Sequence, residues 1–334
     1  MATVLNPESQ NTHQDIKVRT QASFFQSQII LFNSRRKHGL LYSIATLAGL
    51  FCIPGIMGLM GSEIEIQTLI QKALTLPLIT LMITVGMFIL NDLIDVDLDK
   101  TNSKNRPIPS GLVSKKQAWC FIICTNGAAV AMVTASSNLV SVLLVVPMIL
   151  IGILYSLPRE IAFMNRFVIK NASIALFYVL CIMLGVSSSY GIGPALQNPI
   201  IPIHTMAMSG IMIFVGSIVN DLGDTKGDKV VGRRTIPIVM GSKNTVKMLI
   251  ILLACMPAIS WMLYATFVKH NDSLSTMMIM TPIAVSIIAS LAIFRMTKIE
   301  KVAEDMKLMR EQHKKWFPLY MVLQLGMVIG SFMP

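Results

Sequence analysis

Two short acidic segments carry most of the side chains that could do chemistry in this sequence. The first reads NDLIDVDLDK from Asn91 to Lys100, and the second reads NDLGDTKGDK from Asn220 to Lys229. Both fit the pattern N-D-L-x-D-x-x-x-D-K, and each is followed by an arginine and an Ile-Pro pair. A match of this kind indicates an internal structural repeat.

The spacing within each segment places three carboxylates on one helix face. Offsets of three and seven residues return to the same side of an α-helix. The aspartates therefore form two stripes, which are Asp92, Asp95 and Asp99 in the first and Asp221, Asp224 and Asp228 in the second. Like charges this close repel one another unless a cation lies between them, and Mg²⁺ prefers a few carboxylates together with substrate phosphate. We predict that the stripes bind Mg²⁺ ions, which hold a diphosphate and stabilise it as a leaving group.

Asp97 lies off the first stripe and is the weaker candidate. Basic residues beside the stripes are predicted to contact diphosphate oxygens, arginine with a two-pronged contact. These residues are Lys100, Lys104, Arg106, Lys226, Lys229, Arg233 and Arg234. In a further basic connection, Tyr155 and Ser156 precede Lys170. The tyrosine could stabilise a carbocation or orient an acceptor, and the alternative is an aromatic anchor at the membrane interface.

The elements that position these residues are predicted to be membrane helices. Of the 334 residues, 54% are hydrophobic and 13% are charged, whereas a soluble domain carries about 25% charged residues. Stretches long and apolar enough to cross a bilayer recur nine times. They cover residues 40–60, 73–94, 117–135, 139–156, 168–187, 201–221, 246–267, 274–295 and 316–333. We expect an all-α membrane protein with nine transmembrane helices in one bundle (31–334), after a polar tail (1–30).

The distribution of charge predicts the orientation of the bundle. Of the 28 Lys and Arg residues, 26 lie before the first span or after an even-numbered span, and only Lys72 and Lys269 lie on the other side. The positive-inside rule then places the N-terminus and both aspartate stripes on the cytoplasmic side of the cell membrane. The net charge of +11 thus faces anionic headgroups and diphosphates rather than nucleic acid. A cation transporter is disfavoured, because the repeats run parallel and the acids lie at helix ends.

These motifs resemble the UbiA superfamily of intramembrane prenyltransferases. The resemblance rests on NDLIDVDLD, NRPIPSG, YSLP and NDLGDTKGDKVVGRRTIPIVMG. It implies a nine-helix fold in which Asn91 and the six stripe aspartates bind Mg²⁺ and diphosphate. It also implies substrate-binding roles for Tyr155 and Ser156. From their positions in and beside the motifs, we predict that Asn220 and Lys170 also bind substrate. A family element before the first helix is matched imperfectly by LFNSRRKHG, where Asn33 and Arg36 are the candidates.

The chemistry implied by the resemblance is transfer of a prenyl group, with geranylgeranyl favoured, from its diphosphate to a lipid-soluble acceptor. RPIPSG and the second motif resemble members that alkylate geranylgeranylglyceryl phosphate in ether-lipid synthesis, a reaction that fits the basic, aromatic-poor connections. Three alternatives stay open: an aromatic or quinone acceptor, a chlorophyllide-type acceptor, and cyclisation of the prenyl diphosphate without an acceptor.

Overall fold

Helices make up nearly all of the chain that the computed structural model describes, and no strand occurs in that part. The described residues are 21–59, 66–101, 106–136, 138–157, 167–189, 199–230, 232–270, 279–302, 311 and 314–332. The long helices are α1 (Phe24–Leu59), α2 (Ile66–Ile94), α4 (Lys115–Ala135), α5 (Leu139–Ser156), α6 (Phe167–Ser189), α8 (Ile200–Val230), α10 (Ser242–His270), α11 (Met280–Val302) and α13 (Phe317–Phe332). Two short helices, α3 (Val96–Thr101) and α9 (Ile236–Met240), follow α2 and α8.

Each predicted span overlaps one long helix, which confirms the all-helical fold class. Within the described residues, seven helices are long and apolar enough to cross a membrane: α2, α4, α5, α6, α8, α10 and α11. In α13 the apolar part is the shorter stretch Phe317–Met327. Helix α8 has 31 residues, so at 1.5 Å per residue it is about 46 Å long. The hydrocarbon core is only about 30 Å thick, so α8 is longer than a helix needs to be to cross it.

Local sequence explains how helices α4 and α5 begin. Ser114 caps α4 in a capping box, in which Gln117 N donates to Ser114 Oγ at 3.2 Å and Ser114 N donates to Gln117 Oε1 at 2.9 Å. Asn138 caps α5 by accepting from Ser141 N at 3.2 Å. These bonds satisfy backbone donors that an α-helix leaves unpaired at its start. Helices α4 and α5 contact each other and are joined by a link of only three residues, so they form a tight helical hairpin.

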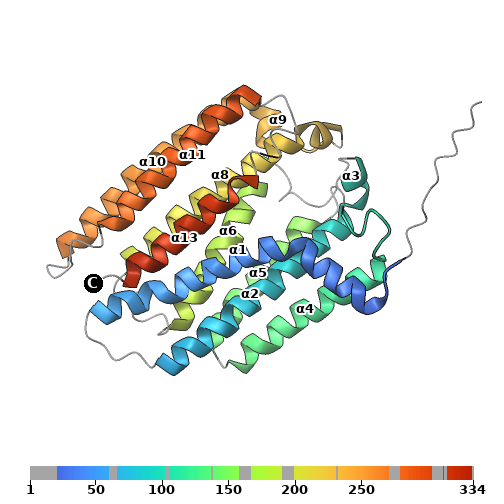
Figure 1. The fold of residues 1–334 in the computed structure, drawn as a ribbon, viewed down its shortest axis with the longest axis horizontal. Coiled ribbons are helices and arrows are strands. Elements are labelled where there is room, and N and C mark those ends of the chain that lie inside the picture. Colours follow the sequence, from blue (N-terminus) through green and yellow to red (C-terminus); the bar gives the residue numbers. More distant parts are fainter. Residues whose placement is uncertain are drawn as a thin grey trace, which may run out of the picture.

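Helix α1 lies at the centre of the bundle, between α2, α6 and α13 (Figure 1). It approaches α6 closely because both helices present glycine at the contact. A β-carbon at Gly49 would collide with the carbonyl oxygen of Ile182, and one at Gly185 with that of Thr46. Small residues permit such backbone contact between membrane helices. Thr46 also contacts Thr80 of α2, with 2.8 Å between the hydroxyl oxygens.

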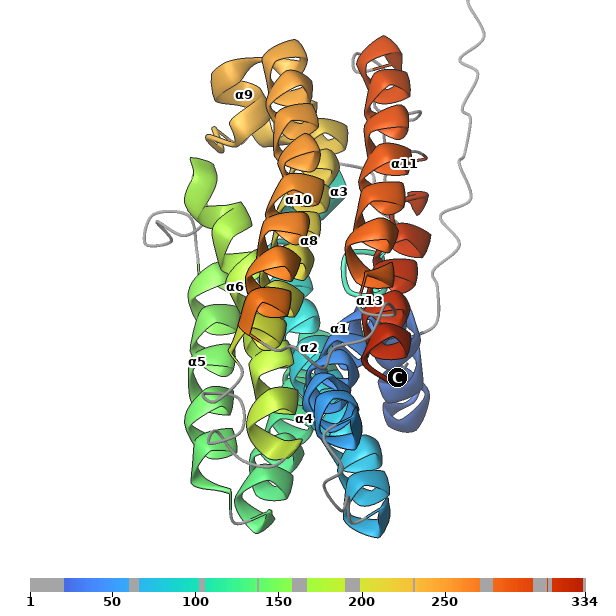
Figure 2. The same ribbon diagram turned by 90° about the vertical axis from the view of Figure 1, so that its left-hand side faces the viewer.

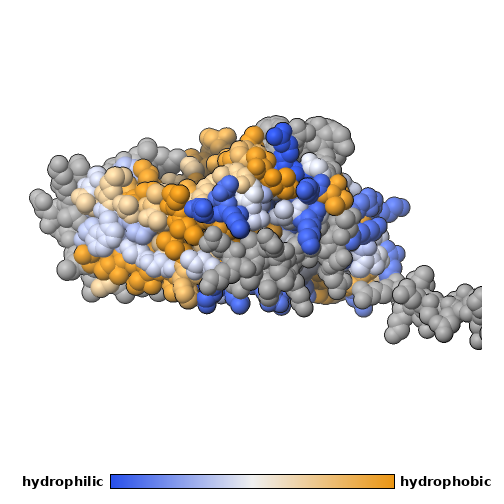
Figure 3. Space-filling view, turned by 90° about the horizontal axis from the view of Figure 1, so that it is seen from above, coloured by the Kyte–Doolittle hydropathy of each residue, from blue (hydrophilic) through white to orange (hydrophobic). Residues whose placement is uncertain are grey.

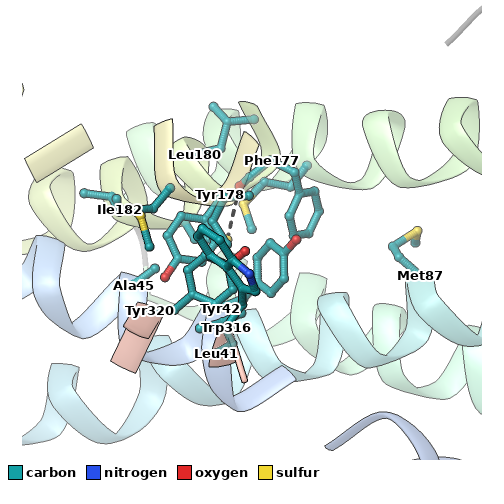
Figure 4. Packing of buried hydrophobic residues seen from close by; sticks show 14 of the residues in the cluster. Leu41, Tyr42, Ala45, Met87, Phe177, Tyr178, Leu180, Ile182, Trp316 and Tyr320 are labelled. Carbon is teal, nitrogen blue, oxygen red and sulfur yellow. Dashed lines mark hydrogen bonds between the residues drawn. The ribbon is translucent and has the colours of Figure 1, made fainter. Parts of the chain in front are cut away.

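Buried aromatic side chains fill the space between α1, α6 and α13 (Figure 4). The ring of Tyr42 meets the edge of Phe177 at 5.3 Å and of Tyr178 at 5.0 Å between centroids. Trp316 and Tyr320 come from the opposite side, at the start of α13, and are also buried. Edge-on contacts of this kind are favourable beyond the apolar area they bury. This cluster fixes α1 relative to the helices that carry the second half of the site.

The short helices α3 and α9 lie at the same end of the bundle, as two perpendicular views agree (Figures 1 and 2). The space-filling view in Figure 3 shows apolar residues over the left and centre and most of the hydrophilic ones in the right half. The right half is also where α3 lies in Figure 1. Helix α3, which carries the end of the first acidic motif, therefore lies towards the more hydrophilic half of this face.

Candidate active site

The first stripe lies where α2 gives way to α3. The predicted single helix is interrupted by a bend at Asp95, although the backbone bonds from Asp95 N to Asn91 O (2.9 Å) and from Asp99 N to Asp95 O (2.8 Å) keep helical spacing. Asp92 and Asp99 are buried, each 1% exposed, and Asp95 is half-buried. Asn91 donates to Asp95 Oδ2 at 3.3 Å. The backbone therefore keeps the helical spacing of the three stripe residues, although the bend divides them between α2 and α3.

The second stripe lies on the last three turns of α8. Asp221, Asp224 and Asp228 are all buried. The chain then reverses at Gly232, whose φ of +66° favours glycine, and Arg233 N donates to the carbonyl oxygen of Asp228 at 2.8 Å. This turn directs the side chain of Arg233 back towards the carboxylates of both motifs.

Arg233 joins the two motifs. Its Nη2 lies 2.8 Å from both carboxylate oxygens of Asp95, and its Nη1 lies 3.7 Å from Asp228 Oδ1. Burial lowers the pKa of this guanidinium, but the attraction of Asp95 and Asp228 outweighs burial, so the pKa is raised above its ordinary value. Arg233 therefore stays charged, and segments 138 residues apart in sequence form one cluster.

Two further arginines bind the first motif. Arg35 of α1 donates from Nε to Asp92 Oδ2 at 2.7 Å and from Nη2 to Asp92 Oδ1. Arg106 contacts Asp92 Oδ1 at 2.6 Å and also Asp99. The predicted contact residue Arg106 thus lies in the cluster. Sequence reasoning missed Arg35 and chose its neighbour Arg36, which is exposed.

Arg35 falls in register with residues of α1 that are buried in the structure, whereas Phe32 and Leu40, in register with Arg36, are exposed. Leu31, Gly39 and Tyr42 lie four residues before, four after and seven after it, and all are buried. An arginine on the buried face of a membrane helix needs an acidic partner, since an unpaired charge there is costly. Asp92 is that partner.

The second motif has its own basic partner on α6. Lys170 Nζ lies 2.5 Å from Asp221 Oδ1, and both side chains are buried. Asn171, which sequence reasoning missed, donates to Asp221 Oδ2 at 3.1 Å and contacts Ser217 Oγ at 2.9 Å. Both oxygens of Asp221 are therefore held from α6, so α6 fixes the position of the second stripe.

The remaining predicted site residues divide into two groups. Tyr155 is half-buried and lies within electrostatic range of Lys170 and Asp221, whereas Ser156 is buried and donates to the backbone of Gly152 at 2.8 Å. The residues whose side chains are exposed and are not brought onto the carboxylates are Asn33, Lys100, Asn220, Lys226, Lys229 and Arg234. Lys104 lies outside the described residues. Asp97 is exposed, as expected for a residue off the stripe.

The donor set suits a hard divalent cation in its chemistry. All six stripe residues offer carboxylate oxygen, which Mg²⁺ prefers, and Asp228 Oδ2 is buried without a hydrogen-bond partner. Among the described residues, however, no three acidic, histidine or cysteine side chains are gathered as a metal site requires. The carboxylates are instead engaged by basic side chains. Cation binding would therefore require some of these ion pairs to open.

Comparison with known proteins gives consistent matches. Residues 39–310 match the UbiA prenyltransferase family. The digeranylgeranylglyceryl phosphate synthase of Methanoculleus marisnigri is 25% identical over 193 residues, which cover 58% of this chain and 66% of that protein. The chain thus spans just under two thirds of the length of such curated relatives.

Solved structures show the same fold. A structure of a digeranylgeranylglyceryl phosphate synthase superposes with a TM-score of 0.64 at 18% identity, over 92% of this chain and 99% of that one. A UbiA homologue from Archaeoglobus fulgidus, bound to GPP and Mg²⁺, gives a TM-score of 0.58 at 18% identity, over 89% and 99%. Because the family match covers most of the sequence, this chain belongs to the UbiA prenyltransferase family.

Proposed function

We propose that this protein transfers a geranylgeranyl group from its diphosphate to geranylgeranylglyceryl phosphate, in a Mg²⁺-dependent reaction within the membrane. The observation that carries the proposal is the contact of Arg233 with Asp95, because it unites two matched acidic motifs in one buried cluster. Relatives named digeranylgeranylglyceryl phosphate synthase support the acceptor, and a family member bound to GPP and Mg²⁺ supports the donor and the metal.

The stripe aspartates would hold the metal, which supplies Lewis-acid stabilisation of the departing diphosphate when bound. The basic side chains of the protein would act on the diphosphate separately from the metal. Four basic side chains already point at this cluster, and their donors suit diphosphate oxygens as well as carboxylates. They are Arg35, Arg106, Lys170 and Arg233. Their positive charge would favour the state in which negative charge gathers on the leaving group.

The apolar bundle provides the second requirement, which is exclusion of water. An allylic cation reacts with any nucleophile that reaches it, so the carbon that loses diphosphate must be shielded. The helices around the cluster are packed with buried apolar side chains. Tyr155, beside Lys170 and Asp221, offers an aromatic face near the charged groups, where it would stabilise a cation.

We further propose nine spans with the N-terminus and the site on the cytoplasmic side. The grouping of α3 and α9 at one end, together with the one-sided distribution of Lys and Arg, supports this orientation. The prenyl diphosphate would then enter from the cytoplasm, and a phosphate-bearing lipid would enter from the membrane.

Purified protein in detergent, incubated with labelled geranylgeranyl diphosphate, Mg²⁺ and separate acceptors, tests the function. We expect labelled digeranylgeranylglyceryl phosphate, loss of product with chelator, and recovery on adding Mg²⁺. Asp92→Asn and Asp221→Asn should each reduce turnover at least about 100-fold, whereas Asp97→Asn should not, because Asp97 is exposed.

The other functions are outcomes of the same assay. Turnover only with a quinone-type or chlorophyllide-type acceptor would change the proposed acceptor but would retain the proposed prenyltransferase activity. A cyclic hydrocarbon formed without an acceptor would identify a cyclase. Undiminished turnover in both Asp92→Asn and Asp221→Asn would disprove the site.

A further inference from the structure

The guanidinium of Arg233 contacts both oxygens of the Asp95 carboxylate. The proposed function assigns the same carboxylate to a metal ion. We propose that Arg233 is an exchangeable internal counterion: it leaves Asp95 when a divalent cation binds there, and its transfer to diphosphate couples binding of the two ligands. This inference rests on the proposed function, because it describes how the same site takes up its ligands.

The geometry favours the exchange. Nη2 of Arg233 lies 2.8 Å from each oxygen of Asp95, so one donor contacts the whole carboxylate edge. A Mg²⁺ ion binds carboxylate oxygen at about 2.0–2.1 Å, where it competes with the guanidinium for the lone pairs of Asp95 and is repelled by its positive charge. The side chain of Arg233 is only 12% exposed, so it must move to another buried position or into solvent.

Two buried atoms in the cluster lack hydrogen-bond partners, and they indicate which ligands the cluster can accept. Nε of Arg233 donates no hydrogen bond, and Oδ2 of Asp228 accepts none. A buried unpaired donor favours an anionic oxygen, and a buried unpaired carboxylate oxygen favours a cation. A diphosphate and a divalent cation together would satisfy both atoms, whereas either ligand alone would satisfy only one.

The backbone confines the movement to the side chain. Arg233 N is held by the carbonyl oxygen of Asp228 at 2.8 Å, and Gly232 N by that of Lys229 at 3.0 Å. The turn at the end of α8 therefore stays in place while the guanidinium exchanges partners.

Charge balance predicts the coupling. Within the described residues, Arg35, Arg106, Lys170 and Arg233 contact the stripe aspartates, so much of the negative charge is already compensated. A divalent cation alone would neutralise the negative charge that remains, but it would leave the displaced Arg233 without a carboxylate partner, which is costly for a largely buried guanidinium. Diphosphate supplies the anion that Arg233 then binds, so each ligand favours the other, and the effect is reciprocal.

The first measurement is Mn²⁺ binding without diphosphate, by electron paramagnetic resonance of free Mn²⁺, on full-length protein in detergent. Arg233→Gln should bind Mn²⁺ about 10-fold more tightly than wild type, because a cation beside the site is removed. Arg233→Lys keeps the charge but not the contact with both oxygens, so its Mn²⁺ affinity should lie between those of wild type and Arg233→Gln. Arg234→Gln, the same change at an exposed neighbour, should match wild type.

The second measurement is binding of radiolabelled inorganic pyrophosphate at increasing Mg²⁺. Mg²⁺ should increase pyrophosphate affinity in wild type and in Arg234→Gln, and the increase should be smaller in Arg233→Gln. Equal or weaker Mn²⁺ binding by Arg233→Gln, with thermal unfolding like wild type, would overturn the counterion role alone. If Arg233→Gln does not fold, Mn²⁺ binding by Arg233→Lys no tighter than wild type would overturn it. Wild-type protein that binds neither probe would overturn the proposed function as well.

Discussion

Arg35 and Asp92 form a two-point ion pair that fastens α1 to the first aspartate motif on α2. Nε of Arg35 lies 2.7 Å from Asp92 Oδ2 while Nη2 contacts Oδ1, and the Arg35 guanidinium carbon lies 5.6 Å from the ring centre of Phe88. Both charged side chains are largely buried, at 11% and 2% exposure. The pair therefore contributes to the position of the site and to the stability of the bundle.

Loss of the Arg35 side chain should destabilise the protein. Arg35→Ala leaves Asp92 in contact with Arg106, and breaking a buried pair from one side costs about 3–5 kcal/mol. Arg35→Lys should recover part of the loss, because lysine keeps the charge without the two-point contact. Thermal unfolding in detergent measures the effect. Arg36→Ala, at an exposed position, is the matched control, and an equal loss there would contradict this account.

Asn171 should act as a positioning residue for Asp221. Asn171→Leu removes the 3.1 Å bond to Asp221 Oδ2, and loss of such a supporting partner typically lowers metal affinity or activity about 10- to 100-fold. We expect a higher Mg²⁺ concentration for half-maximal turnover, which a purely structural role would not produce. Ser217→Ala, which removes a contact to Asn171 but not to Asp221, should change that concentration less. An unchanged Mg²⁺ dependence in Asn171→Leu would refute the assignment.

Close packing of α1 on α6 should make two glycines intolerant of alanine. A β-carbon at Gly49 or Gly185 would strike the backbone of the other helix, and overpacking of this kind costs about 1–3 kcal/mol. Gly127→Ala on α4 meets nothing within 4 Å and should be neutral or stabilising by up to about 1 kcal/mol, because alanine favours helix. Unfolding temperatures of the three variants give the comparison. Equal temperatures would show that α1 and α6 separate easily.

The buried pair of His204 on α8 and Ser260 on α10 should show coupling. Their Nε2 and Oγ atoms are 2.7 Å apart and buried. Ser260→Ala leaves the imidazole unpaired, at a cost of about 1–3 kcal/mol. The double variant His204→Leu/Ser260→Ala should lose less stability than the sum of the single changes, since neither polar group then remains. A double-mutant cycle of thermal unfolding tests this, and strict additivity would contradict it.

Much of the helical arrangement follows from the sequence alone. Apolar stretches of the right length located every long helix. The matched motifs also predicted that Arg106 lies beside the first stripe, where it contacts Asp92 and Asp99.

The sequence could not show which neighbours complete the site, because those contacts depend on helix packing. Arg35 and Arg36 are adjacent and chemically identical, and only the rotation of α1 against α2 brings Arg35 to Asp92. Asn171 lies in an apolar helix with no motif around it, and its role appears only where α6 contacts α8. The motif from Asn91 to Lys100 contains no proline or glycine, so its sequence does not predict the bend at Asp95.

The packing of α13 against α1 bears on how the protein is made. About 290 residues separate the starts of these helices, and synthesis at about 5–20 residues per second means that α1 waits roughly 15–60 s for its neighbour. During that time the side of α1 that carries Tyr42 lacks Trp316 and Tyr320, which later bury it. Lipid chains or an insertion factor must cover that side while the chain is incomplete. If synthesis stops before α13, the incomplete protein in the membrane therefore leaves the aromatic side of α1 uncovered. Protein quality control would recognise the intermediate by that exposed side.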